Sequence, residues 1–146
     1  MTVRKLLDNL GQQLTICRPE DTILLVTSIL STRDIGALPV CDENDNLVGI
    51  VSERDIVNAF ARSGCRLRGL KVGRVMSTNV ISCAPDDSLE KIRTLLRRHR
   101  IRHLPVIERG LVLGILSIRD LLDTSLEETR LEFNASKGDA IAASLS

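Results

Sequence analysis

Apolar residues recur at helical spacing in two separate parts of the chain. The first stripe follows Asp21 and the second follows Asp87, and an acidic residue just before an amphipathic stretch is a typical helix N-cap. Glu90, three residues after Asp87, would complete that cap. The pattern predicts two helices, whose apolar faces comprise Ile23, Val26, Ile29 and Leu30 in one and Leu89, Ile92, Leu95 and Leu96 in the other.

Two short β-rich runs follow each predicted helix, and turn-forming residues join them. The first pair is Leu38–Cys41 and Leu47–Val51, around residues 42–46. The second is Leu104–Ile107 and Leu111–Leu116, around residues 108–110. Each hairpin runs into a helix that begins near Ser52 or Ser117, and a short strand precedes the first helix of each set. The predicted order is strand, helix, strand, strand, helix, twice over.

The chain contains an internal repeat. Residues 37–40 (ALPV) return 66 positions later as 103–106 (HLPV), and residues 49–55 (GIVSERD) return 65 positions later as 114–120 (GILSIRD). Residues 3–7 match 72–76 at an offset of 69, which places about three extra residues near 11–13. Because one copy of about 55 to 60 residues buries little surface, we expect the two to share a core across a pseudo-two-fold axis, with a cleft between them.

These boundaries predict an α/β (α+β) fold of two βαββα repeats. We assign residues 1–62 to the first repeat, 63–71 to a linker and 72–125 to the second repeat. Residues 126–146 form a helical tail, expected as one short helix with a frayed end.

Composition and charge exclude several classes of function. The 20 basic and 19 acidic side chains leave a net charge of +1, which gives no general attraction to nucleic acid or to an anionic membrane. Phe60 and Phe133 are the only aromatic residues, so platforms for base stacking are lacking. The charged start is unlike a signal peptide, and no apolar run reaches the roughly 18 residues of a membrane span. We therefore expect a cytoplasmic protein.

Catalytic and metal-binding patterns are also missing from the sequence. The four cysteines form no CxxC pair and are expected to be structural thiols. His99 and His103 have the i, i+4 spacing of a helical metal pair, but Pro105 should end the helix before His103, so we predict no metal site. No Ser–His–Asp order, paired carboxylates or P-loop is present, and we predict that the chain is not an enzyme.

The repeated block Gly-x-x-Ser-x-Arg-Asp lies at a strand-to-helix junction in both copies and has two explanations. Ser followed three residues later by Asp is a helix capping signature that needs no ligand. The same geometry also suits a nucleotide, because a helix N-terminus attracts phosphate and a carboxylate accepts from a ribose diol. Recurrence of the whole block favours binding, since capping does not require Arg54 or Arg119.

The doubled block after a doubled LPV resembles the tandem CBS domain pair, or Bateman module, over most of residues 3–123. This resemblance implies a disc of two repeats with two clefts for adenosyl compounds: AMP, ADP, ATP, NAD or S-adenosylmethionine. It also implies that the motif Asp holds the ribose and that the motif Ser contacts phosphate. The residues carried over are Asp55 and Asp120, Ser52 and Ser117, with Ile16, Cys17, Val80 and Ile81 beside the adenine and Ala37 and His103 nearby.

The two copies differ where phosphate is expected. Six of the seven residues 97–103 are Arg or His, whereas residues 31–37 contain one Arg and one Asp. By the resemblance, Arg102 matches a position that faces phosphate, and Gly36 in the first copy cannot replace it. Which motif Asp these arginines serve stays open. The alternative is that Arg97, Arg98 and Arg100 form a solvated helix end that the helix dipole favours.

Two functions follow from these patterns. The leading one is a non-catalytic, energy-sensing regulatory module that binds an adenine nucleotide as its regulatory ligand, needs no obligatory cofactor and acts on a separate partner protein or a second copy. The alternative is a structural adaptor with empty clefts. The resemblance implies a homodimer, and the apolar faces expected of the motif helices suit such an interface, at Ile56, Val57 and Phe60 in one and Leu121 and Leu122 in the other.

Overall fold

The computed structural model describes the backbone of residues 1–145 and the side chains of residues 1–137, so residue 146 of the predicted tail lies outside the described residues. The chain divides into two compact units, Met1–Leu116 and the segment from Ser117 onward. The elements in chain order are α1 (Val3–Leu10), α2 (Ile23–Arg33), β1 (Ala37–Cys41), β2 (Leu47–Ser52), α3 (Glu53–Ser63), the 3₁₀ helix η1 (Gly64–Gly69), α4 (Val72–Val75), α5 (Leu89–His99), β3 (His103–Glu108), β4 (Leu111–Ser117) and α6 (Ile118–Leu145).

The predicted mixed fold of two related halves is confirmed. Strands β1 and β2 form one hairpin and β3 and β4 form the other, each a sheet of two strands. The strand predicted at the start of each repeat is reduced to a single parallel bridge, Cys17 to Val40 in the first repeat and Cys83 to Val106 in the second. These two bridges are related by the same 66-residue offset that relates the LPV segments.

The N-caps of α2 and α5 lie one residue after the predicted caps, Asp21 and Asp87. Their N-caps are Thr22 and Ser88, whose hydroxyls accept from the backbone N–H three residues on. The carboxylates of Asp21 and Asp87 instead accept from the backbone N–H three residues earlier, at 2.8 and 2.9 Å. The prediction of Asp as N-cap was therefore wrong, because each Asp closes the turn that precedes the helix.

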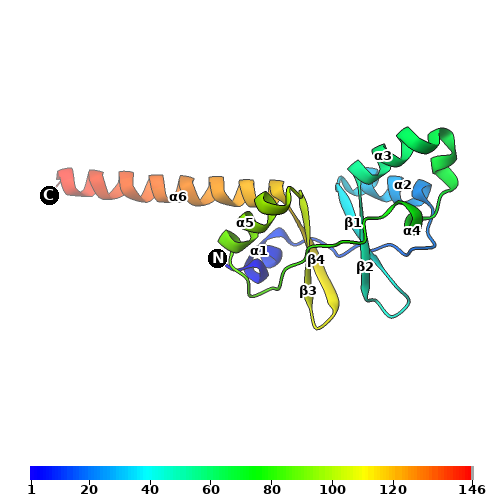
Figure 1. Cartoon of the computed structure of the whole chain (residues 1–146). Coiled ribbons are helices and arrows are strands. Elements are labelled where there is room, and N and C mark those ends of the chain that lie inside the picture. Colours follow the sequence, from blue (N-terminus) through cyan, green and yellow to red (C-terminus); the bar gives the residue numbers. More distant parts are fainter. Residues whose placement is uncertain (146) are drawn as a thin grey trace. The chain divides into compact units, whose positions relative to one another are not determined.

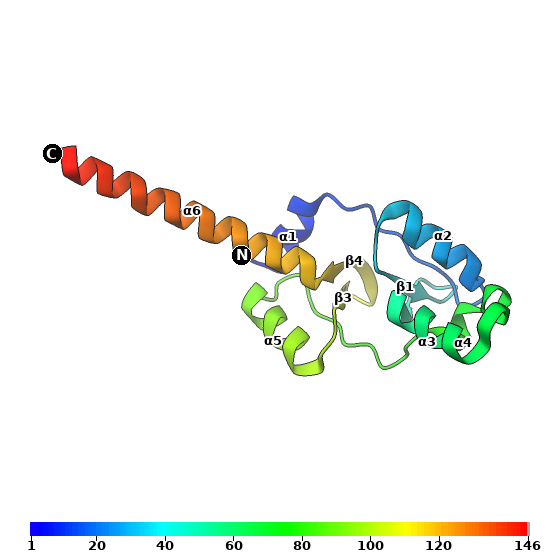
Figure 2. The ribbon, with the colours of Figure 1, turned by 90° about the horizontal axis from the view of Figure 1, so that it is seen from above.

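The short helix that leads into each repeat is hydrogen-bonded to the other repeat. The N–H of Val3 in α1 donates to the carbonyl of Asp87 at 3.0 Å, and the N–H of Val72 in α4 donates to the carbonyl of Asp21 at 2.8 Å. Figures 1 and 2 show α1 beside the β3–β4 hairpin and α4 beside the β1–β2 hairpin. Residues 1–10, predicted to belong to the first repeat, therefore pack against the second.

This exchange makes α4 part of the core of the first repeat. The predicted apolar faces of α2 and α5 are buried, apart from Ile29 and Leu95, which are half-buried. One cluster of buried side chains joins α4 to α2, α3 and the β1–β2 hairpin, and burying its apolar surface stabilises this arrangement. It comprises Cys17, Ile23, Val26, Leu30, Leu38, Val40, Val51, Ala59, Leu67, Val72 and Val75.

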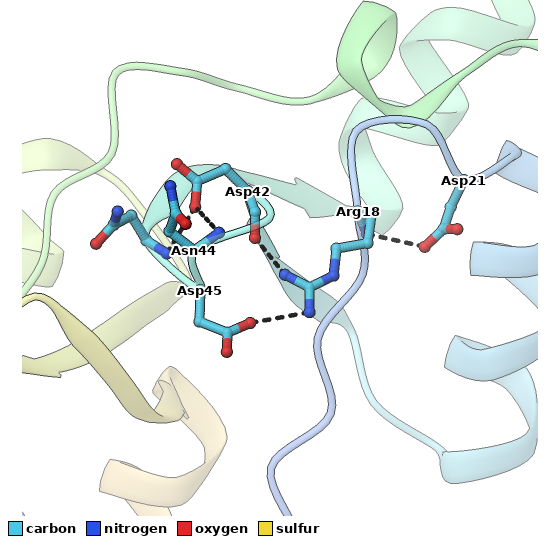
Figure 3. Close-up of polar contacts among 6 residues, drawn as sticks. Arg18, Asp21, Asp42, Asn44 and Asp45 are labelled. Carbon is cyan, nitrogen blue, oxygen red and sulfur yellow. Dashed lines mark hydrogen bonds and ion pairs between the residues drawn. The ribbon is translucent and has the colours of Figure 1, made fainter.

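Arg18 fastens the start of the first repeat to the predicted turn between β1 and β2 (Figure 3). Its guanidinium donates to the carbonyl of Asp42 and forms an ion pair of 2.9 Å with Asp45. The carboxylate of Asp42 accepts from the N–H groups of Asn44 and Asn46, both at 2.9 Å. Short polar side chains thus satisfy the backbone of this turn, as its composition predicts.

The second unit is the helix α6, which runs without interruption from Ile118 to Leu145. The predicted tail thus continues the helix that begins at Ile118, while the domain boundary between residues 125 and 126 and the frayed end stay predictions. No proline or glycine occurs between Gly114 and Gly138, so no residue in this part of the sequence is a strong helix breaker. None of the helices in the described part of the chain combines the length and apolarity needed to cross a membrane.

Candidate functional site

The first motif lies where β2 ends and α3 begins. Ser52 is the N-cap of α3, and its hydroxyl accepts from the N–H of Asp55 at 3.3 Å. The carboxylate of Asp55 accepts from both the N–H and the hydroxyl of Ser52, at 2.9 and 3.0 Å. The capping explanation of this motif is therefore correct as far as the fold is concerned. A capping carboxylate also sits at the positive end of the helix dipole.

The second repeat also holds this carboxylate. The hydroxyl of Ser77 donates to Oδ1 of Asp55 at 2.9 Å. The backbone of Ser77 pairs with Ile50 of β2 through two hydrogen bonds of 2.8 and 2.9 Å. Gly49 makes this approach possible, because a Cβ at that position would lie 2.9 Å from the carbonyl oxygen of Ser77 and 2.6 Å from the sulfur of Met76. The sequence offered no signal for Ser77.

A cavity of about 270 Å³ opens beside this junction and takes its walls from both repeats. Strand β2 and the start of α3 contribute the motif, while the second repeat contributes Ser77, residues 79–81 and residues 100–103. The structure thus brings together eight of the predicted site residues, namely Ser52, Arg54, Asp55, Val80, Ile81, Arg100, Arg102 and His103. The basic segment of the second repeat accordingly shares its cavity with the motif of the first.

The wall of this cavity carries three guanidinium groups and two carboxylates. Arg54, Arg100 and Arg102 are exposed to solvent, and none forms an ion pair within the residues that the structure describes. Arg100 caps the C-terminus of α5 in the left-handed conformation, with φ of 53°, which ends the helix at the cavity. Arg97 and Arg98 do not line the cavity. The alternative of a solvated helix end therefore suits those two residues.

His103 lies against the backbone of the first repeat at Gly36, the residue that the 66-residue offset pairs with Arg102. A Cβ on Gly36 would lie 2.8 Å from Nε2 of His103, so only glycine fits beside the imidazole without a shift. His99 is the last residue of α5 and His103 is the first of β3. Because the two histidines belong to different elements, the i, i+4 helical spacing of a metal pair is not formed.

A second cavity, of about 650 Å³, is lined by residues of the first repeat that are equivalent, at the 66-residue offset, to residues lining the 270 Å³ cavity. Ala37, one of the predicted site residues, lines this cavity, and Asp34 stands where the 270 Å³ cavity has Arg100. Gln12 and Gln13, two of the extra residues of the first repeat, are also part of its wall. The two cavities therefore differ in charge at equivalent positions.

Ile16 and Cys17, predicted beside the adenine, line neither of the two cavities. The N–H of Cys17 donates to Pro39 and its carbonyl accepts from Cys41, so both main-chain groups are already bonded. Burial raises the pKa of the Cys17 thiol to about 12. Leu14 and Thr15 line the second cavity instead. They are the equivalents of Val80 and Ile81 at the 66-residue offset, so applying that offset to Val80 and Ile81 would have predicted them.

The second motif has the same local geometry at the junction of β4 and α6. The N–H of Ser117 donates to the carboxylate of Asp120 at 2.9 Å, and the hydroxyl of Ser117 accepts from the N–H of Asp120 at 3.2 Å. Arg119 is exposed. Ser117, Arg119 and Asp120 belong to the second unit, and neither of the two cavities is lined by them. Their roles toward a ligand therefore stay predictions.

Comparison with known proteins agrees with this architecture. The family model described as "CBS domain" matches the chain twice, over residues 10–62 and 72–127. The chain belongs to the CBS domain family. This tandem CBS pair is 32% identical to the CBS domain-containing protein YhcV of Bacillus subtilis over 114 residues, which cover 78% of the chain and 80% of that protein.

Solved structures support the same assignment. A CBS-domain containing protein from Agrobacterium tumefaciens is 31% identical and superposes with a TM-score of 0.81, covering 86% of this chain and 99% of that one. Other relatives are enzymes of which the pair matches only a part. A homoserine O-acetyltransferase of Methanococcus vannielii is 30% identical over 71% of this chain, but the match spans only 21% of the enzyme.

Proposed function

We propose that the CBS pair is a non-catalytic regulatory module and that the 270 Å³ cavity binds an adenine nucleotide. The observation that carries this proposal is the meeting of Asp55 from one repeat with Arg100 and Arg102 from the other around a single cavity. A carboxylate at a helix N-terminus opposite free guanidinium groups offers partners for both the diol and the phosphate of a nucleotide.

The chemistry of the wall suits the parts of such a ligand. The carboxylate of Asp55 accepts from the ribose hydroxyls in place of the hydroxyl of Ser77, while Ser52 and the guanidinium groups bind the phosphate. Ile50, Val80 and Ile101 supply aliphatic surface for the adenine, which has no aromatic partner here. A volume of about 270 Å³ lies just below the usual range of ligand pockets, roughly 300–1,000 Å³, and favours a mononucleotide over the larger NAD.

Another CBS domain pair with the same fold binds adenosyl compounds. The CBS domain pair of the protein MJ0100 was crystallised in complex with 5′-methylthioadenosine and S-adenosyl-L-methionine, and it superposes on this chain with a TM-score of 0.77 at 24% identity. A nucleotide in the proposed site contacts both repeats, so its binding energy favours one arrangement of the two over others. A partner protein or a second copy then detects that arrangement.

A second candidate is the structural adaptor, which one observation favours. The carboxylate of Asp55 already accepts three hydrogen bonds, two from Ser52 and one from Ser77. The motif is thus satisfied by the fold alone. In this account the cavities stay empty and the pair only presents surfaces to other proteins.

Calorimetric titration separates the two candidates. Adenosine, AMP, ADP, ATP, NAD and S-adenosylmethionine are titrated into the wild-type chain, the Arg102→Ala variant and, as a matched control, the Arg97→Ala variant. We expect Arg102→Ala to weaken AMP and ATP by about 1–3 kcal/mol while adenosine changes little, and Arg97→Ala to have no effect. Equal losses for adenosine and AMP would refute the phosphate role. Absence of heat with every compound would favour the adaptor.

A further inference from the structure

The helix α6 carries an apolar stripe that its own unit does not cover. Leu122, Leu126 and Phe133 are exposed over 57%, 69% and 65% of their surface. With Thr129 and Ser136 they follow one another at intervals of four, three, four and three residues. At 100° per residue these five positions, which we call the seam, lie on one face of the helix. Spacing of this kind is typical of the a and d positions of a coiled coil.

A helix with this seam gains stability from a partner. Single helices in water are marginal, because most helical stability in proteins comes from packing of an apolar face. The second unit is this one helix, so it has no second element of its own against which the seam can pack. Burying apolar side chains stabilises an association, and the seam offers three large ones for burial, Leu122, Leu126 and Phe133.

The charges beside the seam favour a second copy of the same helix. In a parallel coiled coil, a residue at position g lies beside position e of the next heptad of its partner. With Leu126 at position a, Glu132 occupies g and Lys137 occupies e, so two identical helices in register pair opposite charges on both sides. A membrane surface is a poorer partner, because five of the eight charged residues of α6 up to Lys137 are acidic.

We propose that α6 associates with α6 of a second copy as a parallel, two-stranded coiled coil through the seam. The seam includes Thr129 and Ser136 and is short, so this contact adds to a dimer rather than forming a strong one by itself. The proposal is independent of nucleotide binding, and it specifies the surface through which one copy of the chain contacts another.

Cysteine cross-linking of the full chain tests this contact directly. In a Cys65→Ser background, which removes the exposed native thiol, Thr129→Cys places a thiol in the seam and Leu131→Cys places one on the far side of the same helix. Thr129 and Leu131 are both exposed, so the two variants differ mainly in the face of the helix that carries the thiol. We expect mild oxidation without nucleotide to convert most Thr129→Cys chains, but few Leu131→Cys chains, into covalent dimers. Equal yields would overturn the proposal.

Charge exchange provides a second test that does not depend on thiols. Glu132→Lys should reduce the cross-linking yield of Thr129→Cys several-fold by opposing Lys137 of the partner helix. Adding Lys137→Glu should restore the yield, because the opposite charges then meet again. Circular dichroism of each variant verifies that the chain is folded. Failure of the double exchange to restore cross-linking would contradict the parallel arrangement.

Discussion

The hydroxyl of Ser77 donates a hydrogen bond of 2.9 Å to Oδ1 of Asp55, and this bond joins the two repeats at the candidate site. The acceptor, Asp55, is the motif carboxylate of the first repeat. The donor, Ser77, lies just after α4, the helix that leads into the second repeat. The bond therefore stabilises the repeat boundary and orients the carboxylate at the same time.

Replacing Ser77 by alanine should lower the free energy of unfolding by about 0.5–1 kcal/mol, since this exposed hydrogen bond is lost. Urea denaturation measures the change. Thr78→Ala is the matched control, because Thr78 is an exposed neighbour without a hydrogen bond in the described part of the chain. Equal stability of the two variants would show that the bond between Ser77 and Asp55 contributes nothing.

Gly49→Ala should be the most destabilising of three glycine substitutions, by about 1–3 kcal/mol. Its Cβ would meet the backbone oxygen of Ser77 at 2.9 Å, which is unable to move without breaking the pairing with β2. At Gly114 the contact is with the flexible end of Leu7 at 3.0 Å, so Gly114→Ala should lose less. Gly69→Ala meets nothing within 4 Å and serves as the control. A larger loss of stability for Gly69→Ala than for Gly49→Ala would contradict the packing described.

Stability should depend on pH through Asp87. The backbone N–H of Ala84 and the ammonium of Lys91 donate to its carboxylate at 2.9 and 3.0 Å, and both hold the pKa of Asp87 below its ordinary value of 3.8. A carboxyl whose pKa is lower in the folded chain stabilises the fold above its unfolded pKa. This contribution is lost as the pH falls below about 3.8 and through the folded pKa.

The Asp87→Asn variant should therefore show a shallower loss of unfolding free energy in acid than the wild type, with the difference confined to the region around and below pH 3.8. Unfolding by urea at pH values from about 2 to 6 measures this slope. Asp86→Asn, the exposed neighbour, is the control. Identical slopes for the wild type and Asp87→Asn would refute the assignment.

Only Cys65 should react with a thiol reagent in the folded chain. It is exposed, whereas Cys17, Cys41 and Cys83 are buried. Burial raises the pKa of the Cys17 and Cys83 thiols to about 12, so almost no thiolate forms at pH 8. Titration with a chromogenic disulfide should count one thiol in buffer and four in denaturant. Rapid reaction of more than one thiol in buffer would show that the core is open.

Much of this fold was predictable because the repeat itself is visible in the sequence. The 66-residue offset pairs the caps, the LPV strands and the two bridges at Cys17 and Cys83. The exchange of α1 and α4 was not predictable, because an offset relates two segments without saying which repeat each one contacts. The one-residue error at Asp21 has a local cause, since its carboxylate closes a turn and leaves the cap to Thr22.

The candidate site was predictable in part. Asp55 and Ser52 could be found from the motif, but the motif did not tell that Arg100 and Arg102 lie around the same cavity as Asp55. That relation depends on how the two repeats pack together, which is a tertiary property. Ser77 was missed because a lone serine after an apolar segment carries no pattern.

Calorimetric titration of AMP into the wild type and the Asp55→Asn variant tests the central claim most directly, with Asp86→Asn as a control that removes an exposed carboxylate lining neither cavity. We predict that Asp55→Asn weakens binding by about 1–3 kcal/mol, roughly a 5- to 150-fold rise in Kd, while Asp86→Asn keeps the wild-type affinity. Unchanged affinity in a folded Asp55→Asn variant would contradict the account.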